Sequence, residues 1–248
     1  MKHRQNEVKK KHNGLLIFVV VILLGVALFL TSGLFFQIKT IRVEGISACS
    51  KSEVLELAGF SAGDNILIIN KANSARQITE KLPYAQSVVI TREMPDTVVI
   101  TVTETQAAAA IENRGAYWLF DTEGVLLETV HIPPKLPIVT GTELITPFPG
   151  DKINLSEPEK SIYLLSLLEE MQKLGILEDV SEIDIQELAD VIFLYRSQYI
   201  VALGVPEGLE KKLRVMEKAL QEMDYTGPGM FDLSTVLDND IARFFKEE

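Results

Sequence analysis

Apolar residues follow different spacings along this chain, and each spacing predicts a different kind of element. The first is an unbroken run at residues 15–36, which holds twenty-two residues without a charge. As a helix, such a run extends about 33 Å, enough to cross a hydrocarbon core of about 30 Å. Residues 1–14 carry five lysines and arginines against one glutamate, so the positive-inside rule places them in the cytoplasm. The pattern predicts one transmembrane helix over 15–36, a cytoplasmic tail before it, and the remaining chain outside the membrane.

A cleaved signal peptide and a lipoprotein are the two other interpretations of this run. Thr31 and Gly33 are small residues at a spacing typical of signal-peptidase sites, but the run is longer than the usual apolar region of about 7 to 15 residues. Cys49 ends a sequence similar to a lipobox, yet three charged residues separate it from the run. We therefore expect an uncleaved anchor and interpret Cys49 as a small buried hydrophobic residue.

Strand-like alternation and helix caps predict a first module over residues 38–106. Its expected elements are a strand at 40–45, a helix opened by a capping box at Ser50 and Glu53, a helix opened by a second box at Ser74 and Gln77, and a hairpin of strands at 87–92 and 96–104. Val98, Ile100 and Val102 share one face of the last strand. This order predicts an α+β unit with both helices on one face of a three-stranded sheet.

A second module is expected over residues 107–235, and a tail over 236–248. It begins with a hairpin, because strand-like residues at 117–120 and 125–127 flank the turn sequence DTEG. Two helices follow: one opened by a capping box at 156–159, with Ile162, Leu165, Leu168 and Met171 on its apolar side, and one from residue 207, with Leu209, Leu213, Met216, Leu220 and Met223 on its apolar side. Further strands are expected at 183–185, 191–195, 199–203 and 230–233.

The charge balance argues against nucleic acid as a partner. The chain has 24 basic and 35 acidic residues, and without residues 1–14 the counts are 19 and 34. Such an acidic surface repels nucleic acid and anionic lipid. The helix after residue 207 does carry basic residues between glutamates, and we expect these on a solvated face: Lys211, Lys212, Arg214 and Lys218.

Residues capable of catalysis are few. His131 is the only histidine after residue 36, and the single cysteine excludes an intrachain disulfide. No spacing of His, Cys or Glu suits a metal, and no phosphate-binding or nucleophile motif occurs. Carboxylate pairs such as Asp121 with Glu123 are expected to be solvated in so acidic a chain. The sequence predicts no catalytic residue, no cofactor and no metal.

Several short motifs carry a family resemblance. They are Val43-Glu44-Gly45, Gly63-Asp64-Asn65, Leu82-Pro83-Tyr84-Ala85 and the run from Arg92 to Glu104 in the first module, then Trp118, Asp121, Gly124-Val125 and the run from Leu136 to Gly141 in the second. The first set resembles a POTRA domain. Together with the second set and the preceding span, it resembles the bacterial cell-division family FtsQ/DivIB. Residues 105–107 depart from the family pattern, which has a basic residue and a proline there.

The resemblance implies a fold class and a function. The fold expected is α+β: one transmembrane helix, a POTRA-like β-α-α-β-β domain, and a mixed α/β domain built on an extended antiparallel sheet. The function expected is a non-catalytic scaffold at the division septum. Its implied partners are single-span division proteins of the FtsB/DivIC and FtsL types, and a septal peptidoglycan synthase. The alternatives are a POTRA-containing subunit for envelope assembly, transport or sensing, and a membrane-anchored envelope enzyme.

The partner-binding site is expected at the last strand and the tail. A sheet that ends near the C-terminus leaves backbone groups that can template a strand from another chain. The residues expected at this edge are Met230, Phe231, Asp232, Leu233 and Ser234. The apolar tail residues expected to order against the partner are Val236, Leu237, Ile241, Phe244 and Phe245. The alternative is that this tail packs on its own domain.

Overall fold

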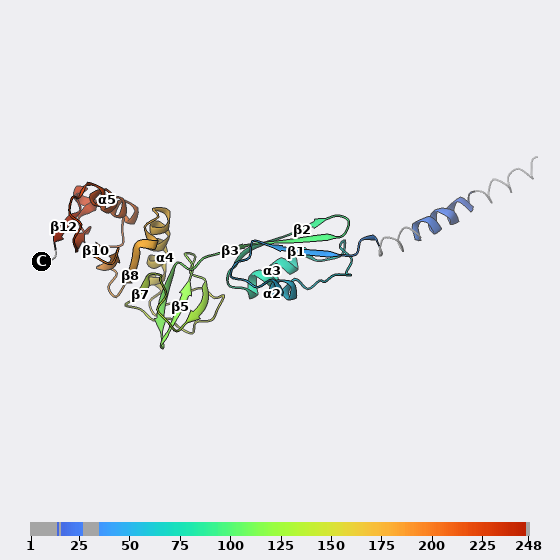
Figure 1. Ribbon diagram of the computed structural model, residues 1–248, viewed down its shortest axis with the longest axis horizontal. Helices are drawn as coiled ribbons and strands as arrows, with labels where there is room; N and C mark the ends of the chain where they lie inside the picture. Colours follow the sequence, from blue (N-terminus) through green and yellow to red (C-terminus); the bar gives the residue numbers. More distant parts are fainter. Residues whose placement is uncertain (1–13, 15, 27–34, 247–248) are drawn as a thin grey trace, which may run out of the picture. The chain divides into compact units, whose positions relative to one another are not determined.

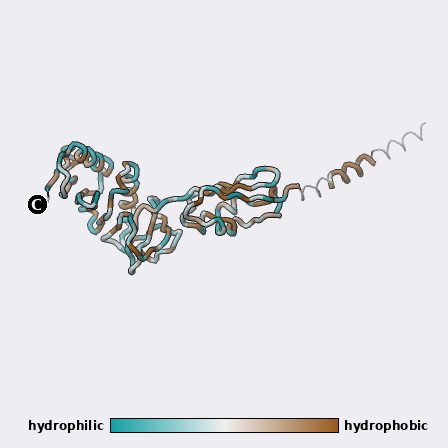
Figure 2. The backbone as a smooth tube through the Cα atoms, viewed as in Figure 1, coloured by the Kyte–Doolittle hydropathy of each residue, from teal (hydrophilic) through white to brown (hydrophobic). Residues whose placement is uncertain are grey.

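The computed structural model describes residue 14, residues 16–26 and residues 35–246 (Figure 1). Of the expected span, residues 16–26 are helical and apolar (Figure 2), whereas residues 15 and 27–34 lie outside the described part, as do 1–13. Within the described part, no helix has both the length and the apolar character needed to cross a membrane. The chain forms two compact units: unit 1 comprises residues up to Lys81 together with Ala85–Glu104, and unit 2 comprises Leu82–Tyr84 with the chain from Thr105 onward.

Unit 1 contains the expected β-α-α-β-β order. Its elements are β1 (Thr40–Glu44), α2 (Lys51–Ala58), α3 (Lys71–Lys81), β2 (Ala85–Glu93) and β3 (Thr97–Glu104). The sheet order is β1-β3-β2, with β3 parallel to β1 and antiparallel to β2. Val98, Ile100 and Val102 are all buried, as the period-two pattern predicts, and α2 and α3 lie on the same side of the sheet (Figure 1).

One of the two helix starts predicted in unit 1 is confirmed and the other is wrong. Ser50 and Glu53 form a complete capping box at the start of α2. The second helix begins earlier than predicted, because the Asn70 side chain accepts a hydrogen bond from the Asn73 backbone N–H at 3.1 Å. Ser74 is therefore buried inside α3, where its hydroxyl donates to the Ala58 carbonyl and ties α3 to α2.

Unit 2 is built on one nine-stranded sheet. Its elements are β4 (Ala109–Asn113), β5 (Ala116–Phe120), β6 (Leu126–Val130), β7 (Ile138–Thr140), α4 (Pro158–Lys173), the short 3₁₀ helix η1 (Leu177–Asp179), β8 (Val180–Asp184), β9 (Val191–Tyr195), β10 (Tyr199–Gly204), α5 (Leu209–Glu222), β11 (Gly229–Asp232), α6 (Val236–Asn239) and β12 (Arg243–Lys246). The strand order is β12-β11-β10-β9-β8-β7-β4-β5-β6, so β12 and β6 are its two edges.

The sheet is mixed, and the expectation of an antiparallel sheet is wrong. Three of its pairings are parallel: β4 with β7, β7 with β8, and β10 with β11. The last two follow from connectivity, because α4 and α5 each return the chain to the end of the sheet where the preceding strand began. Residues of α4 and α5 pack with alternate strand residues in one continuous core. On the opposite face Ile200 and Met230 are exposed, so part of that face is uncovered.

Three details of the unit 2 helices differ from expectation. Helix α4 begins at Pro158 without a side-chain cap, so the predicted capping box at 156–159 does not form. Its buried side agrees only in part with the predicted one. Leu168 and Met171 are buried as predicted, but Ile162 is 71 % exposed, and the helix buries Leu164 and Leu167 instead. Lys212 is not on a solvated face but completely buried, and its ammonium donates to the carbonyls of Leu203 at 2.8 Å and Val205 at 2.6 Å.

Candidate partner-binding surface

One edge of the unit 2 sheet is β12, which comes from the tail. Met230–Ser234 was expected at the edge, but β11 lies between β10 and β12. Four residue pairs join β11 to β12, from Gly229 with Lys246 to Asp232 with Arg243. Within the described residues β12 pairs with β11 alone. Its outward backbone N–H and C=O groups are therefore free to pair with another strand.

The tail reaches this position because apolar residues attach it at both ends. Val236 in α6 is fully buried. In β12, the Phe244 ring packs on Phe231 at 4.8 Å and on Tyr225 at 5.7 Å between ring centroids. A side chain at Gly229 would collide with the Phe244 ring, so the close approach requires glycine there. The tail therefore packs on its own domain, which was the alternative interpretation of its sequence.

A row of apolar side chains, partly buried on β9 and exposed on β10, β11 and β12, leads across the uncovered face of the sheet to this edge. The strand register places Leu194, Ile200, Met230 and Phe245 side by side on β9, β10, β11 and β12; we call these four residues the open-face stripe. Ile200 is 40 % exposed, Met230 36 % and Phe245 54 %. Apolar groups that are contiguous and exposed are typical of interaction surfaces.

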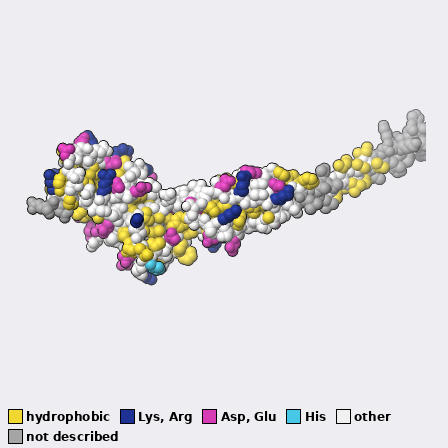
Figure 3. Space-filling model, in the orientation of Figure 1, with side chains coloured by type: hydrophobic (Ala, Val, Ile, Leu, Met, Phe, Trp, Pro, Cys, Tyr) yellow, Lys and Arg dark blue, Asp and Glu magenta, His cyan; other side chains and the backbone are white. Residues whose placement is uncertain are grey.

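Charged groups border the stripe. Arg243 lies on the same face of β12 as Phe245. Lys246 lies on the other face, and its ammonium is 4.6 Å from the centre of the Tyr225 ring. Across from Arg243, the Asp232 carboxylate accepts hydrogen bonds from the hydroxyl and the backbone N–H of Ser234, which lower the pKa of Asp232 below its ordinary value. Elsewhere, acidic and basic side chains are interspersed on the visible faces of both units (Figure 3).

The predicted site residues divide into buried and exposed groups. Phe231, Leu233 and Val236 are buried in the core, and Phe244 and Asp232 are partly buried. Met230, Ser234, Leu237, Ile241 and Phe245 are exposed. The sequence interpretation missed Leu194 and Ile200, although each alternates with buried neighbours within its strand. That alternation showed which face they share, but not that this face is uncovered.

Groups considered for catalysis have structural or solvated positions. Asp121 is not solvated but buried, and its carboxylate accepts hydrogen bonds from the backbone N–H groups of Glu123 and Val125 and from the Thr105 hydroxyl. His131 is exposed in a loop. Burial raises the pKa of the partly buried Cys49 thiol to about 12, helped by a hydrogen bond to Glu104, so this thiol is unreactive at neutral pH.

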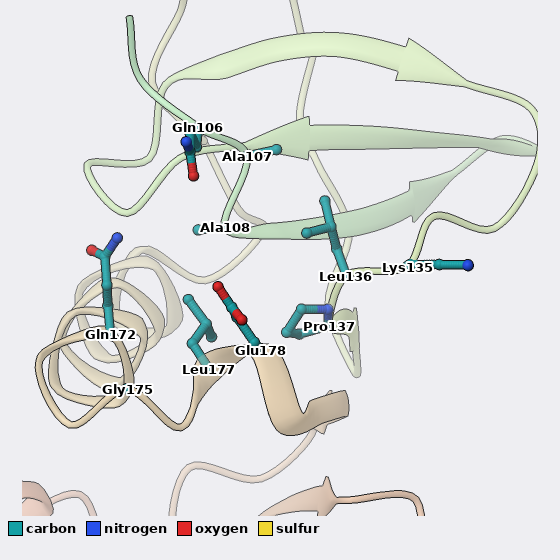
Figure 4. Close-up of a pocket in the computed structure, with 10 residues that line it drawn as sticks. All are labelled: Gln106, Ala107, Ala108, Lys135, Leu136, Pro137, Gln172, Gly175, Leu177 and Glu178. Atoms are coloured by element: carbon teal, nitrogen blue, oxygen red, sulfur yellow. The ribbon is translucent and has the colours of Figure 1, made fainter.

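A hollow of about 530 Å³ lies between the start of β4 and the end of α4 (Figure 4). Leu177 and Glu178 point toward this space and Lys135 points away from it. Its ten lining residues, all within the described part of the chain, include no serine, cysteine or histidine. Its two charged lining residues are Lys135 and Glu178, of which only Glu178 points into the space.

Comparisons with known proteins assign both units to one family. Residues 36–105 match the model of the FtsQ-type POTRA domain, and residues 109–234 match the model of the C-terminal region of cell division protein FtsQ/DivIB. The chain is 26 % identical to cell division protein DivIB of Clostridium acetobutylicum, over 72 % of this chain and 71 % of that protein.

Two further relatives match this chain over a similar or larger share of its length. The chain is 28 % identical to cell division protein FtsQ of a Geobacter species, over 76 % of this chain and 71 % of the relative. It is 22 % identical to cell division protein DivIB of Clostridium botulinum, over 92 % of this chain and 91 % of the relative. With both units matched in the expected order, the chain belongs to the FtsQ/DivIB family of cell division proteins.

Proposed function

We propose that this protein is a membrane-anchored, non-catalytic scaffold of the division machinery, and that it binds an FtsB/DivIC-like partner by strand addition at β12. The observation that carries the proposal is the combination of a free sheet edge at Arg243–Lys246 with the open-face stripe beside it. Strand addition takes its affinity from backbone hydrogen bonds and its specificity from side chains on alternate positions.

The anchor in this proposal is the apolar run at residues 15–36, with the N-terminus in the cytoplasm and both units outside. Other single-span proteins of the FtsL type, and a septal peptidoglycan synthase, would then be reached from the same side of the membrane. A scaffold of this kind needs binding surfaces and no reactive groups, which agrees with the positions of Asp121, His131 and Cys49 described above.

Strand addition is proposed at β12 and not at Met230–Ser234, because β11 has strands on both sides. A partner strand beside Phe245 would extend the sheet to a tenth strand, and apolar side chains next to that strand could cover the open-face stripe. Arg243 and Lys246 at the edge oppose self-association through charge repulsion. They also favour an acidic segment in the partner.

The test uses the full chain copurified with the FtsB/DivIC-type protein of the same bacterium. Phe245→Ala is expected to weaken the complex by about 10- to 100-fold, since a central apolar anchor contributes about 1.4 to 2.8 kcal/mol. Ile162→Ala is the matched control, because Ile162 is also exposed and apolar but lies on α4, outside the stripe. This control is expected to bind normally.

Hydrogen exchange on the complex locates the added strand. Backbone amides of β12 are expected to exchange more slowly when the partner is bound, while those of β6, the opposite edge of the same sheet, are expected not to change. Unchanged exchange throughout β12 in a saturated complex would show that the partner binds elsewhere and would refute strand addition at this edge.

A further inference from the structure

Four exposed apolar side chains gather at one end of unit 1. Phe35 is 74 % exposed, Leu67 44 %, Ile68 80 % and Met94 52 %; we call them the end patch. Figure 3 shows apolar side chains exposed at the end of unit 1 where the chain enters it. Isolated exposed apolar residues are common, but here they come from three separate segments and share one location.

Hydrogen bonds hold these three segments together. The Ile66 backbone N–H donates to the Phe36 carbonyl at 2.8 Å, which fixes the loop carrying Leu67 and Ile68 beside the entering chain. The Lys39 backbone N–H donates to the Asp96 carbonyl at 2.8 Å, which brings the turn containing Met94 to the same end. The position of the patch is therefore set by the backbone of unit 1.

The loop itself is rigidly connected to the sheet. The Arg92 guanidinium, from the end of β2, donates to the carbonyls of Leu67 at 3.2 Å and Ile69 at 2.9 Å. The Asn65 side chain accepts a hydrogen bond from the Leu67 backbone N–H at 2.9 Å. With Ile66 and Ile69 buried, the chain presents Leu67 and Ile68 outward as a short apolar projection.

Two of the cations near the patch are paired with carboxylates, and a third, the Arg92 guanidinium, is bonded to the carbonyls of Leu67 and Ile69. The Lys39 ammonium lies 3.0 Å from the Asp96 carboxylate, and Arg42 forms an ion pair with Glu93. Attraction between this end of unit 1 and anionic groups would thus be weak. Burial of apolar surface is the interaction that the end patch offers.

We propose that the end patch inserts into the interfacial layer of the bilayer that anchors the chain, and so fixes the orientation of unit 1 at the membrane surface. The inference rests on the proposed anchor. Phe35 and Phe36 are the last residues of the uncharged run 15–36, and the Ile66–Phe36 hydrogen bond holds the loop beside them. If the run ends at the membrane surface, the apolar side chains of the loop reach the boundary between headgroups and acyl chains, where such groups are stable.

The experiment uses the full chain with Cys49→Ser and a single new cysteine labelled with the environment-sensitive dye NBD. Ile68→Cys places the dye in the end patch. Val89→Cys is the matched control, because Val89 is 60 % exposed in the middle of β2, about 13 Å along the strand from its end at Glu93. Both proteins are reconstituted in phosphatidylcholine vesicles with and without brominated acyl chains, and flotation of the vesicles reports anchoring separately.

At position 68 we expect blue-shifted emission that brominated lipid quenches, with little effect of salt. At position 89 we expect emission typical of water and no quenching. A protein that floats with the vesicles but shows no quenching at position 68 would overturn the inference and leave the anchor intact. A blue shift without quenching would mean that protein, such as a second copy, covers the patch, and would also overturn it. Failure to float would refute the proposed anchor and the inference together.

Discussion

The attachment of β12 to its own domain depends on Phe244, and replacing this residue tests whether the sheet edge exists as described. Phe244 lies on the core side of β12, and its ring contacts the rings of Phe231, Tyr225 and Tyr199 at centroid distances of 4.8, 5.7 and 6.2 Å. Its neighbour Phe245 lies on the opposite face and is 54 % exposed. The two residues therefore form a matched pair within one strand.

The expected cost follows from burial and ring contacts. Removing a fully buried Phe side chain costs about 3 to 5 kcal/mol, and a partly buried one about half of that. Loss of the close Phe231 contact adds roughly 0.5 to 1 kcal/mol. We expect Phe244→Ala to destabilise the attachment of β12 by about 2 to 3 kcal/mol. This corresponds to a roughly 30- to 150-fold increase in the opening equilibrium of the strand.

Hydrogen exchange measured on the full chain distinguishes local from global opening. In Phe244→Ala, the amides of the β11–β12 ladder are expected to exchange about 30 to 150 times faster. The amides of α4 exchange through global unfolding, so their rates report any change in the stability of the whole unit. Phe245→Ala is expected to change both by less than about threefold, since a half-exposed side chain loses little on truncation. Equal effects of the two substitutions, or no effect of Phe244→Ala on β12, would refute this placement of the tail.

Two further predictions concern unit 1. The Glu104 carboxylate is partly buried, which tends to raise its pKa, but N–H donors from Ala48, Cys49 and Ser47 outweigh burial and bring the pKa below its ordinary value of 4.5. The ionised Glu104 carboxylate therefore stabilises unit 1 above pH 4.5, and this stabilisation is lost as the pH falls through the lower folded-state pKa. Glu104→Gln should lower the free energy of unfolding in urea by about 1 kcal/mol at pH 7 and by progressively less in acid. A difference that does not depend on pH would contradict this. Val98 is fully buried, and Val98→Asp should destabilise unit 1 by more than about 3 kcal/mol because it buries an unpaired charge, whereas an unchanged melting curve would show that the face of β3 is misassigned.

The sequence predicted the elements whose signals are local. Period-two alternation gave the buried face of β3, a short turn sequence gave the β5–β6 hairpin, and the Ser50–Glu53 box gave the start of α2. Each signal acts between residues close together in the chain, so the pattern alone suffices. The two-unit organisation followed from the order of these elements.

Positions that depend on distant partners could not be predicted in the same way. The charge of Lys212 suggested solvent, but two carbonyls at the end of β10 and beyond accept its hydrogen bonds inside the protein. Asp121 likewise is buried because two backbone N–H groups of the following turn and the Thr105 hydroxyl donate hydrogen bonds to its carboxylate. A buried polar group is stable only with partners, and sequence spacing does not show which partners fold around it.

The candidate site illustrates the same division. The sequence identified the apolar residues of the last strand and tail, but which strand forms the edge was decided by tertiary structure. β12 has only four residues, too few for a clear alternation of apolar and polar positions. It forms because the Phe244 ring packs on the rings of Phe231 and Tyr199. Alternation assigns a residue to a face of a strand, whereas exposure of that face and of the sheet edge depends on every other segment that packs there.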